Sequence, residues 1–355
     1  MNNDRIQEIL DLMEEARLDY FLISDPQSIA YCTGYYNDPH ERMFVFMISK
    51  HGNHTLFMND LFYLDHDLDV NIVWHKDGQD AIQTIVDEMH FPGRIGIDKN
   101  WASHFLLDLM KKLPDAKYIN ASPCVDLVRM KKDLQEQVLM IESSKINDAV
   151  MEEIIPFIQE GVTEKQLAKK LDELFFNHHS TCYGAIVAFG KNAADPHHEN
   201  DDTLLRKGDC VLIDMGCVYK GYCSDMTRTF FYEGILEEEI KVYEIVKKAN
   251  EAAEATIKPG VKLSDIDKCA RKVISDEGYG KYFTHRLGHF IGRDVHEYGD
   301  VSSVNEMEVE EGMIFSIEPG IYLEGNFGVR VEDLVMVTKD GCQVLNSFTK
   351  DIYII

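Results

Sequence analysis

The sequence predicts an α/β protein of two domains, the second of which combines α-helices with antiparallel strands in the α+β manner. Three observations lead to this prediction. Helix-like and strand-like segments alternate through residues 1–123, two strand pairs with turn signals occupy residues 211–231 and 312–338, and 355 residues with 45% hydrophobic composition are enough for two cores.

The first 123 residues are predicted to form a smaller α/β domain. The patterns indicate helices near residues 4–17, 79–90 and 101–112, and strands near residues 19–23, 43–48 and 54–58. We expect the boundary near Ala121-Ser122-Pro123, so that the second domain covers residues 124–355. That domain opens with a long helical pattern over residues 133–158, after which Thr163 and Gln166 form a capping box that begins the next helix.

Composition limits the class of protein. A formal net charge of -26 disfavours nucleic acid or an anionic membrane as a partner. The chain contains no apolar run of 18 residues, and its first residues have the pattern of an amphipathic helix and a strand instead of a signal peptide. Eight cysteines without a CxxC motif are typical of reduced thiols. We therefore expect an enzyme of the cytoplasm.

Two aspartates stand in the first strand pair, VLIDMGCVYKGYCSDMTRTFF. If the turn is Tyr219-Lys220, Asp214 and Asp225 are direct cross-strand partners, with Cβ atoms roughly 4.5–5.5 Å apart. Two carboxylates at that separation repel unless a cation lies between them or one takes up a proton. A turn shifted by one residue would change the partner. The alternative is a solvated hairpin with two ordinary surface aspartates.

Two glutamates repeat this arrangement in the second strand pair, GMIFSIEPGIYLEGNFGVRVEDLVMVT. Glu318 and Glu332 interrupt apolar runs that otherwise have the composition of a core. Buried carboxylates are rare unless they are paired or bind a metal. The alternative is a salt bridge, for example between Glu332 and Arg330, but four acids in two hairpin-like segments favour metal binding.

Histidines supply the remaining ligand type. His285, His289 and His296 lie in HRLGHFIGRDVHE, where Gly288 allows the backbone to approach a site closely. One of these histidines would bind metal while another handles protons. The pair His197-His198 follows Pro196 in a polar stretch, residues 191–202, that is predicted to be a loop overhanging a pocket.

The motifs DMG, SDMTRTF, HRLGHFIGRDVHE, SIEPGIY and GVRVED follow one another in this order. Together they resemble the metallopeptidase family that contains Xaa-Pro dipeptidase (prolidase), aminopeptidase P and methionine aminopeptidase, with creatinase as a metal-free relative. The resemblance covers residues 124–355. It implies a pita-bread catalytic domain whose curved antiparallel sheet holds a dinuclear metal centre, preceded by a creatinase/prolidase-type N-terminal domain.

The resemblance also implies a role for each motif residue. Asp214 would chelate one metal, and His289 and Glu318 would bind mainly the other. Asp225 and Glu332 would bridge the two metals. The catalytic residues implied in this way are His197, His296, Glu318 and Arg330.

The chemistry of this ligand set can be stated from general principles. Two divalent cations offset four carboxylates and lower the pKa of bound water from about 15.7 toward 7, which supplies a bridging hydroxide as the nucleophile. His296 would stabilise the oxyanion, and Glu318 would shuttle the proton. A carboxylate-rich site favours Mn²⁺, while the single imidazole keeps Co²⁺ and Zn²⁺ open.

The predicted function is hydrolysis of Xaa-Pro dipeptides, with a small peptide that carries proline in its second position as substrate and a homodimer as the assembly. The N-terminal domain points away from methionine aminopeptidases, which lack it. Aminopeptidase P, which removes the first residue of Xaa-Pro-Yaa peptides, is the alternative. A creatinase-like hydrolase or a non-catalytic binding protein would not need all five ligands.

Substrate contacts are predicted for Arg293, Phe290, Tyr36 and His285. An Xaa-Pro bond has no N–H, so its site must supply an apolar slot, which aromatic residues such as Tyr36, Phe290 and Tyr298 would line unless they serve ordinary packing. The carboxylate of a dipeptide also needs a cation, for which Arg330 and Arg293 are the candidates.

Two departures from the family pattern concern this cation. The chain has GHFIGRDVHE where relatives commonly have GHGIGLDVHE, and EYGD after His296 lacks the arginine that some prolidases carry. We hypothesise that Arg293 pairs with an acid of the loop NDPHER, residues 37–42, from the same chain or a dimer partner, and gates the site. The alternative is a solvent-facing arginine.

Overall fold

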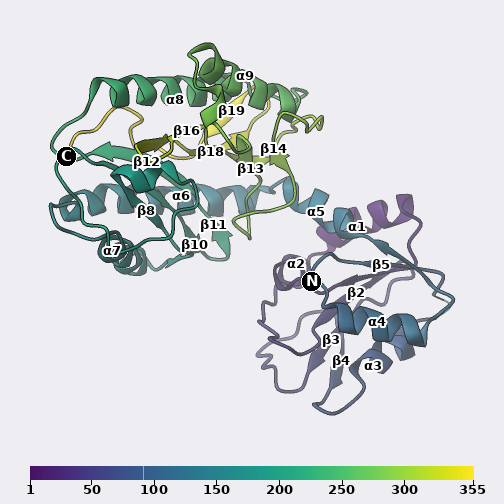
Figure 1. Ribbon diagram of the computed structural model, residues 1–355. Helices are drawn as coiled ribbons and strands as arrows, with labels where there is room; N and C mark the ends of the chain where they lie inside the picture. Colours follow the sequence, from purple (N-terminus) through teal and green to yellow (C-terminus); the bar gives the residue numbers. More distant parts are fainter. Residues whose placement is uncertain (91) are drawn as a thin grey trace. The chain divides into compact units, whose positions relative to one another are not determined.

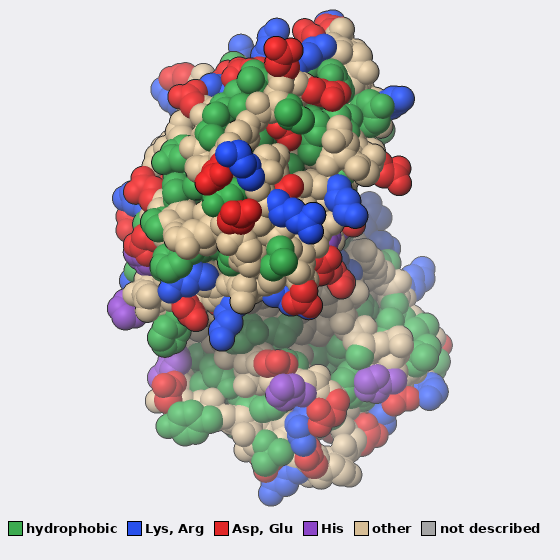
Figure 2. Space-filling view, turned by 60° about the vertical axis from the view of Figure 1, so that its left-hand side comes forward, with side chains coloured by type: hydrophobic (Ala, Val, Ile, Leu, Met, Phe, Trp, Pro, Cys, Tyr) green, Lys and Arg blue, Asp and Glu red, His purple; other side chains and the backbone are tan. Residues whose placement is uncertain are grey.

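The computed structural model describes residues 1–90 and 92–355, and the chain divides into two compact units, Met1–Arg129 and Met130–Ile355. Figure 1 shows that each unit has its own strands and its own covering helices. On the face shown in Figure 2, acidic and basic side chains are interspersed over the surface. Among the described residues, no helix combines the length and the apolar character that crossing a membrane requires.

The first unit is a six-stranded sheet between two layers of helices. Its sheet has the order β4-β3-β2-β1-β5-β6, with β1 antiparallel to β2 and parallel to β5. Alternate strand residues enter two separate cores: Phe21 and Phe46 pack on one face, while Leu22 and Met47 pack on the other. The elements are α1 (Asn3–Glu15), β1 (Tyr20–Ile23), α2 (Pro26–Thr33), β2 (Val45–Ser49), β3 (Thr55–Asn59), β4 (Asn71–His75), α3 (Ala81–Glu88), β5 (Arg94–Ile97), α4 (Ser103–Lys112), β6 (Lys117–Asn120) and α5 (Ser122–Met130).

The predicted α/β class of this unit is confirmed, and the three helices and three strands expected from periodicity are present within a few residues. The sequence patterns missed α2 and the parallel strands β4, β5 and β6. The strands β4 and β6 are mostly exposed or half-buried and have polar residues at their ends, and β5 has only three buried residues, so none of them gives a clear apolar run.

The second unit places short antiparallel sheets between two pairs of helices. In Figure 1, α8 and α9 lie on one side of the strands and α6 and α7 on the other. The capping box of Thr163 and Gln166 begins α7 as predicted. The helices are α6 (Leu134–Ile154), α7 (Glu164–Asn177), α8 (Glu237–Thr256) and α9 (Leu263–Asp276), with 3₁₀ turns η1 (Ile155–Phe157), η2 (Gly190–Ala194) and η3 (Gly280–Tyr282).

The strands of the second unit form two long hairpins that are interrupted in the middle. The first joins β9 to β12 and β10 to β11, and the second joins β15 to β18 and β16 to β17. Asp225 lies at the interruption of the first hairpin and Glu318 and Glu332 lie at that of the second, whereas Asp214 is a paired residue of β9. The strands are β7 (Thr181–Cys182), β8 (Ile186–Phe189), β9 (Cys210–Met215), β10 (Cys217–Tyr219), β11 (Tyr222–Cys223), β12 (Met226–Phe231), β13 (Gly288–His289), β14 (Asp300–Val301), β15 (Ile314–Ile317), β16 (Gly320–Leu323), β17 (Phe327–Arg330), β18 (Asp333–Val337) and β19 (Cys342–Val344).

Candidate active site

A cavity of about 360 Å³ opens in the second unit between the two interrupted hairpins and the β13 segment. Its size lies within the range of small-molecule sites. All five residues predicted as metal ligands line it, together with the histidines and the arginine predicted beside them. The lining residues are Tyr183, Gly184, Ile186, Pro196, His197, Asp214, Asp225, His285, Arg286, His289, Val295, His296, Glu318, Arg330 and Glu332.

The register of the first hairpin differs from the prediction. The turn residues are Lys220 and Gly221, both with positive φ (48° and 82°), which is the conformation of a type I′ turn. Asp214 therefore pairs with Thr227, and Asp225 is its diagonal neighbour instead of its direct partner. Because this shift changes the pairing by two residues, the side-chain alternation is preserved and both carboxylates still face the cavity.

The second hairpin brings its glutamates together at the break in its ladder. The paired segments flanking the break match Ile317 with Asp333 and Gly320 with Arg330, so Glu318 and Glu332 lie between them. The Glu332 carboxylate is 2% exposed and accepts a hydrogen bond of 2.6 Å from the Thr227 hydroxyl on β12. Thr227 thus ties the second hairpin to the first.

His289 reaches the acids on a strand that lies unusually close to β15. A Cβ atom on Gly288 would stand 1.9 Å from the Ser316 carbonyl oxygen, so glycine is required there. The His289 N–H donates to the Ser316 hydroxyl at 3.0 Å, and the Glu318 N–H donates to the Leu287 carbonyl at 2.8 Å. The close approach that Gly288 was expected to allow is confirmed.

The imidazole of His289 presents a lone pair to two carboxylates. Its Nδ1 lies 3.2 Å from the Phe290 carbonyl oxygen, which can only accept, so Nδ1 carries the proton. Burial lowers the pKa of His289 to about 3, and the ring is neutral. Its Nε2 therefore faces Asp225 and Glu318, each at 3.6 Å, without a proton to share. A cation between these atoms would remove the repulsion, and Asp225, His289 and Glu332 form a group that could hold one.

The buried carboxylates also lack sufficient positive charge from the protein. Burial raises the pKa of Asp225 well above its usual range, and Asp214 and Glu318 raise it further. Burial likewise raises the pKa of Glu332, followed by the charge of Asp225, and raises the pKa of Glu318 to about 7. Divalent cations would reverse these shifts, so the donor set fits metal ions.

The guanidinium of Arg330 is bonded to residues of the acid cluster and its neighbours. Its side chain is 3% exposed, and its Nη2 lies 2.6 Å from the Asp214 carboxylate. Its other nitrogens donate to the Thr227 hydroxyl at 3.0 Å and to the Tyr322 hydroxyl at 3.0 Å. The salt bridge considered from the sequence thus exists, but with Asp214 instead of Glu332.

The histidine-bearing loop above the cavity is fastened by a second acidic group. His197 lines the cavity, whereas His198 turns away and lies 2.6 Å from the Glu164 carboxylate. Glu164 also accepts hydrogen bonds from the N–H groups of Phe189 and Asp201 and from the Asn192 amide. Glu164, His198 and Asp201 are a further set of ligand-type residues that could hold a metal.

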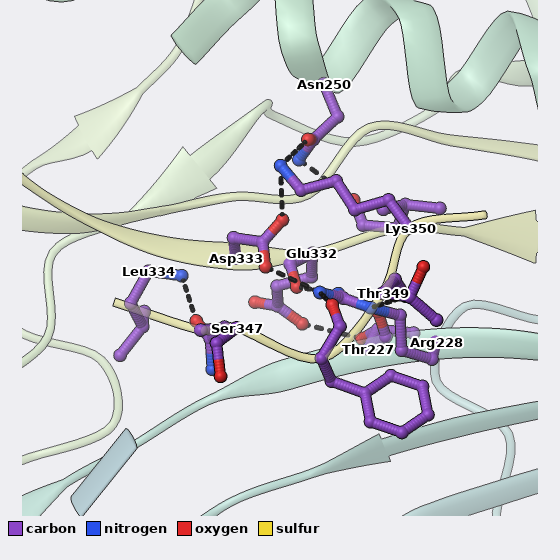
Figure 3. A network of polar contacts seen from close by, with 12 residues as sticks. Thr227, Arg228, Asn250, Glu332, Asp333, Leu334, Ser347, Thr349 and Lys350 are labelled. Carbon is purple, nitrogen blue, oxygen red and sulfur yellow. Dashed lines mark hydrogen bonds and ion pairs between the residues drawn. The ribbon is translucent and has the colours of Figure 1, made fainter. Parts of the chain in front are cut away.

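Behind the cavity, a buried polar network supports the strands that carry the glutamates (Figure 3). Arg228 donates to the carbonyl oxygen of Glu332 at 2.7 Å and pairs with Asp333 at 2.7 Å. Lys350 lies 2.8 Å from the second oxygen of Asp333. Asn250 donates to the Ile317 carbonyl at 2.9 Å. These contacts fix the backbone directly beside Glu318 and Glu332.

Two residues of the second unit that were predicted to contact substrate lie outside the cavity lining. Phe290 is fully buried and packs against Phe315 with ring centroids 5.3 Å apart. Its aromatic ring is therefore part of the core, because the packing of the fold and not the motif decides which way the side chain points. Arg293 lies over the Tyr222 ring outside the cavity lining, and its N–H donates to Glu297. Tyr36 is an exposed residue of the first unit, and its role stays a prediction.

Two lining residues with polar side chains, Tyr183 and Arg286, were not predicted. The Tyr183 hydroxyl donates to the Ser224 carbonyl at 2.7 Å, and a Cβ atom on Gly216 would overlap it, but no local pattern in the sequence marks this contact. Arg286 stands beside His285 within a motif that the sequence did reveal. Its position between His285 and His289 in this motif is the sequence feature that could have indicated a place in the cavity lining.

Two family models match this chain. The model of metallopeptidase family M24 matches residues 138–339, and the model of the creatinase/prolidase N-terminal domain matches residues 5–131. An uncharacterized peptidase of Staphylococcus aureus (strain bovine RF122) is 34% identical over 98% of this chain and 99% of its own length.

Two solved structures extend over both units. A dipeptidase from Pyrococcus horikoshii is 35% identical with a TM-score of 0.93, covering 99% of this chain and 100% of its own. A prolidase from Thermococcus sibiricus is 31% identical with a TM-score of 0.93, covering 100% of this chain and 99% of its own. The fold class expected from the sequence is therefore confirmed.

Proposed function

The chain belongs to metallopeptidase family M24, and from that premise we propose that it is a dinuclear Xaa-Pro dipeptidase. The relatives described as a dipeptidase and a prolidase support this specificity. The observation that carries the metal assignment is the neutral His289, whose Nε2 faces Asp225 and Glu318 at 3.6 Å each. Asp214 and Glu332 complete the set of ligands for two divalent cations.

Two bound cations would supply Lewis-acid activation of water and of the scissile carbonyl at neutral pH. The side chains of the chain do the remaining work. Glu318 takes the proton released by the attacking water and passes it to the proline nitrogen as the C–N bond breaks, so that the products are an Xaa carboxylate and free proline. His197 and His296 enter the cavity from separate loops, and their N–H groups donate to the carbonyl oxygen as negative charge develops on it.

Arg330 acts by positioning the metal ligands. Since its guanidinium holds Asp214 and reaches Thr227, which in turn holds Glu332, one buried cation fixes an acid from each hairpin. We expect Mn²⁺ as the metal, with Co²⁺ and Zn²⁺ as alternatives, because carboxylates outnumber imidazoles. We also expect a homodimer. Metal analysis of the purified protein and sedimentation velocity check these two expectations.

The specificity is tested by offering the manganese-loaded enzyme Leu-Pro, Leu-Pro-Gly and Met-Ala-Ser. A dipeptidase prefers the first peptide by its kcat/KM. Preference for Leu-Pro-Gly would favour aminopeptidase P, and preference for Met-Ala-Ser would refute proline specificity. Turnover of creatine without metal would overturn the peptidase proposal altogether.

A further inference from the structure

The cavity contains a cation that the catalytic arrangement does not use. Arg286 lines the cavity, and its side chain is exposed. Among the residues that the structure describes, its guanidinium has no ion pair. Arg330, the other arginine of the lining, is instead taken up by Asp214 and by the hydroxyl groups of Thr227 and Tyr322. Apart from the proposed metal ions, Arg286 is therefore the arginine of the described lining that is available to a ligand.

The neighbouring His285 does not supply this charge. Burial lowers the pKa of His285 to about 4, so the ring is neutral near pH 7. Its Nδ1 lies 2.6 Å from the Arg286 carbonyl oxygen and carries the proton, so its Nε2 accepts a hydrogen bond of 2.8 Å from the Tyr322 hydroxyl. Of the two arginines in the described lining, Arg286 is thus the one left to pair with a negatively charged ligand group.

Arg286 lines the same cavity as His296 and Glu318, which both belong to the proposed catalytic machinery. Its side chain therefore borders the space in which a substrate held against these residues would lie.

The backbone that carries Arg286 is held firmly. Arg271, itself paired with Asp267 at 2.8 Å, donates to the carbonyl oxygens of Phe283 at 3.1 Å and His285 at 3.0 Å. The His285 ring fastens the next carbonyl, that of Arg286. A fixed backbone reduces the conformational entropy lost when the guanidinium binds a ligand.

We propose that Arg286 binds the α-carboxylate of a dipeptide substrate and thereby selects dipeptides over longer peptides. This inference rests on the proposed dipeptidase function and adds the residue that distinguishes dipeptides from longer peptides. A guanidinium matches a carboxylate through two parallel N–H···O bonds. In a longer peptide the same position holds an uncharged amide, and the pairing is lost.

The test compares Leu-Pro with leucyl-prolinamide, whose terminal carboxylate is blocked. For Arg286→Gln we expect kcat/KM for Leu-Pro to fall about 10- to 100-fold, mainly through KM, because a charge-assisted contact to the ground state is lost. Activity on leucyl-prolinamide should stay within about twofold. Arg286→Lys should recover part of the loss, since it keeps the charge without the fork. Lys281→Gln is the matched control, which removes an exposed positive charge from the neighbouring η3 turn.

Product inhibition gives a second readout. L-proline should inhibit the wild-type enzyme more strongly than L-prolinamide, and Arg286→Gln should abolish the difference. Equal losses on the two dipeptides, or an unchanged KM for Leu-Pro, would overturn the assignment of Arg286 while leaving the peptidase intact. A wild-type enzyme that cleaves neither peptide would refute the proposed function itself, and this inference with it.

Discussion

Two clusters in the second unit combine carboxylates with one histidine, yet their charges are balanced in opposite ways. In the cluster of Glu164, His198 and Asp201, the protein itself satisfies the central carboxylate, which accepts from two backbone N–H groups, an amide and the imidazole. In the cavity cluster, His289 instead faces two carboxylates at 3.6 Å with its unprotonated nitrogen.

This difference shows that the presence of carboxylates and a histidine is not sufficient to identify a metal site. The hydrogen-bond donors around these side chains must also be considered. Buried polar groups are nearly always hydrogen-bonded, and a set that lacks donors needs a cation from outside the protein. The Glu164 cluster has its donors and serves to fasten the loop of His197. In the cavity cluster, Thr227 donates to Glu332 and Arg330 donates to Asp214, but His289 offers no proton to Asp225 or Glu318, which is why we assign the metals there.

The comparison can be broken most sharply by making the same substitution in both clusters. Asp225→Asn removes a proposed bridging charge, and since metal catalysis supplies several kcal/mol, kcat/KM for Leu-Pro should fall by about 10³-fold or more. Asp201→Asn, in the other cluster, should change neither activity nor metal content by more than about twofold. Steady-state kinetics and metal analysis measure both variants. Full turnover by Asp225→Asn would refute the dinuclear site.

Removal of the metals should destabilise the folded protein. The clustered acids would repel one another, and binding energy that favours the folded state would be lost, about 3–4 kcal/mol for a metal at 100 to 1,000 times its Kd. Scanning calorimetry with and without a chelator should show a lower Tm after chelation. Asp201→Asn should show the same decrease. An unchanged Tm after verified metal removal would count against a pre-formed cluster.

The sequence could predict that the acids converge, but it could not predict how they are satisfied. Asp214, Asp225, Glu318 and Glu332 stand out because they interrupt apolar runs, and the structure places all four around one cavity. Whether a carboxylate meets backbone N–H groups depends on segments far away in the chain. The sequence did not single out Glu164, although its carboxylate holds the loop that carries His198.

Two further differences have local causes. The turn of the first hairpin was placed one residue early, because a type I′ turn requires positive φ at two successive residues and Lys220 adopts this conformation beside Gly221. Phe290 was predicted to contact substrate, but motif position does not show which face of a segment packs inward.

The role of the Glu164 cluster as a fastening is tested by Glu164→Gln. The amide cannot accept all four hydrogen bonds, so the loop over residues 190–201 should loosen and displace His197. We expect kcat/KM to fall about tenfold, mainly through kcat, with unchanged metal content. Limited proteolysis within the loop should become faster. Glu173→Gln, an exposed position on the same helix, is the control. A loss of metal together with activity would show that this cluster also binds an ion.

A half-buried acid, Glu254, provides an intermediate case for this comparison. Glu254 is neither fully satisfied by hydrogen bonds nor left without a cation, because Lys350 lies 2.6 Å from its carboxylate and shares its charge with Asp333. Burial raises the pKa of Glu254 to about 7, and the charge of Asp333 adds to the shift. The ion pair therefore offsets the cost of burial only in part.

This position predicts a small pH effect of definite sign. Between pH 4.5 and about 7 the folded state binds more protons at Glu254 than the unfolded state, so the free energy of unfolding decreases as pH rises through this window. Glu254→Gln cannot ionise, and its stability relative to wild type should increase by about 1–3 kcal/mol from pH 5 to pH 8. Urea unfolding at several pH values measures this difference, with the exposed Glu251→Gln on the same helix as control. A difference that is constant with pH would show that Lys350 satisfies Glu254 as fully as the backbone and its neighbours satisfy Glu164.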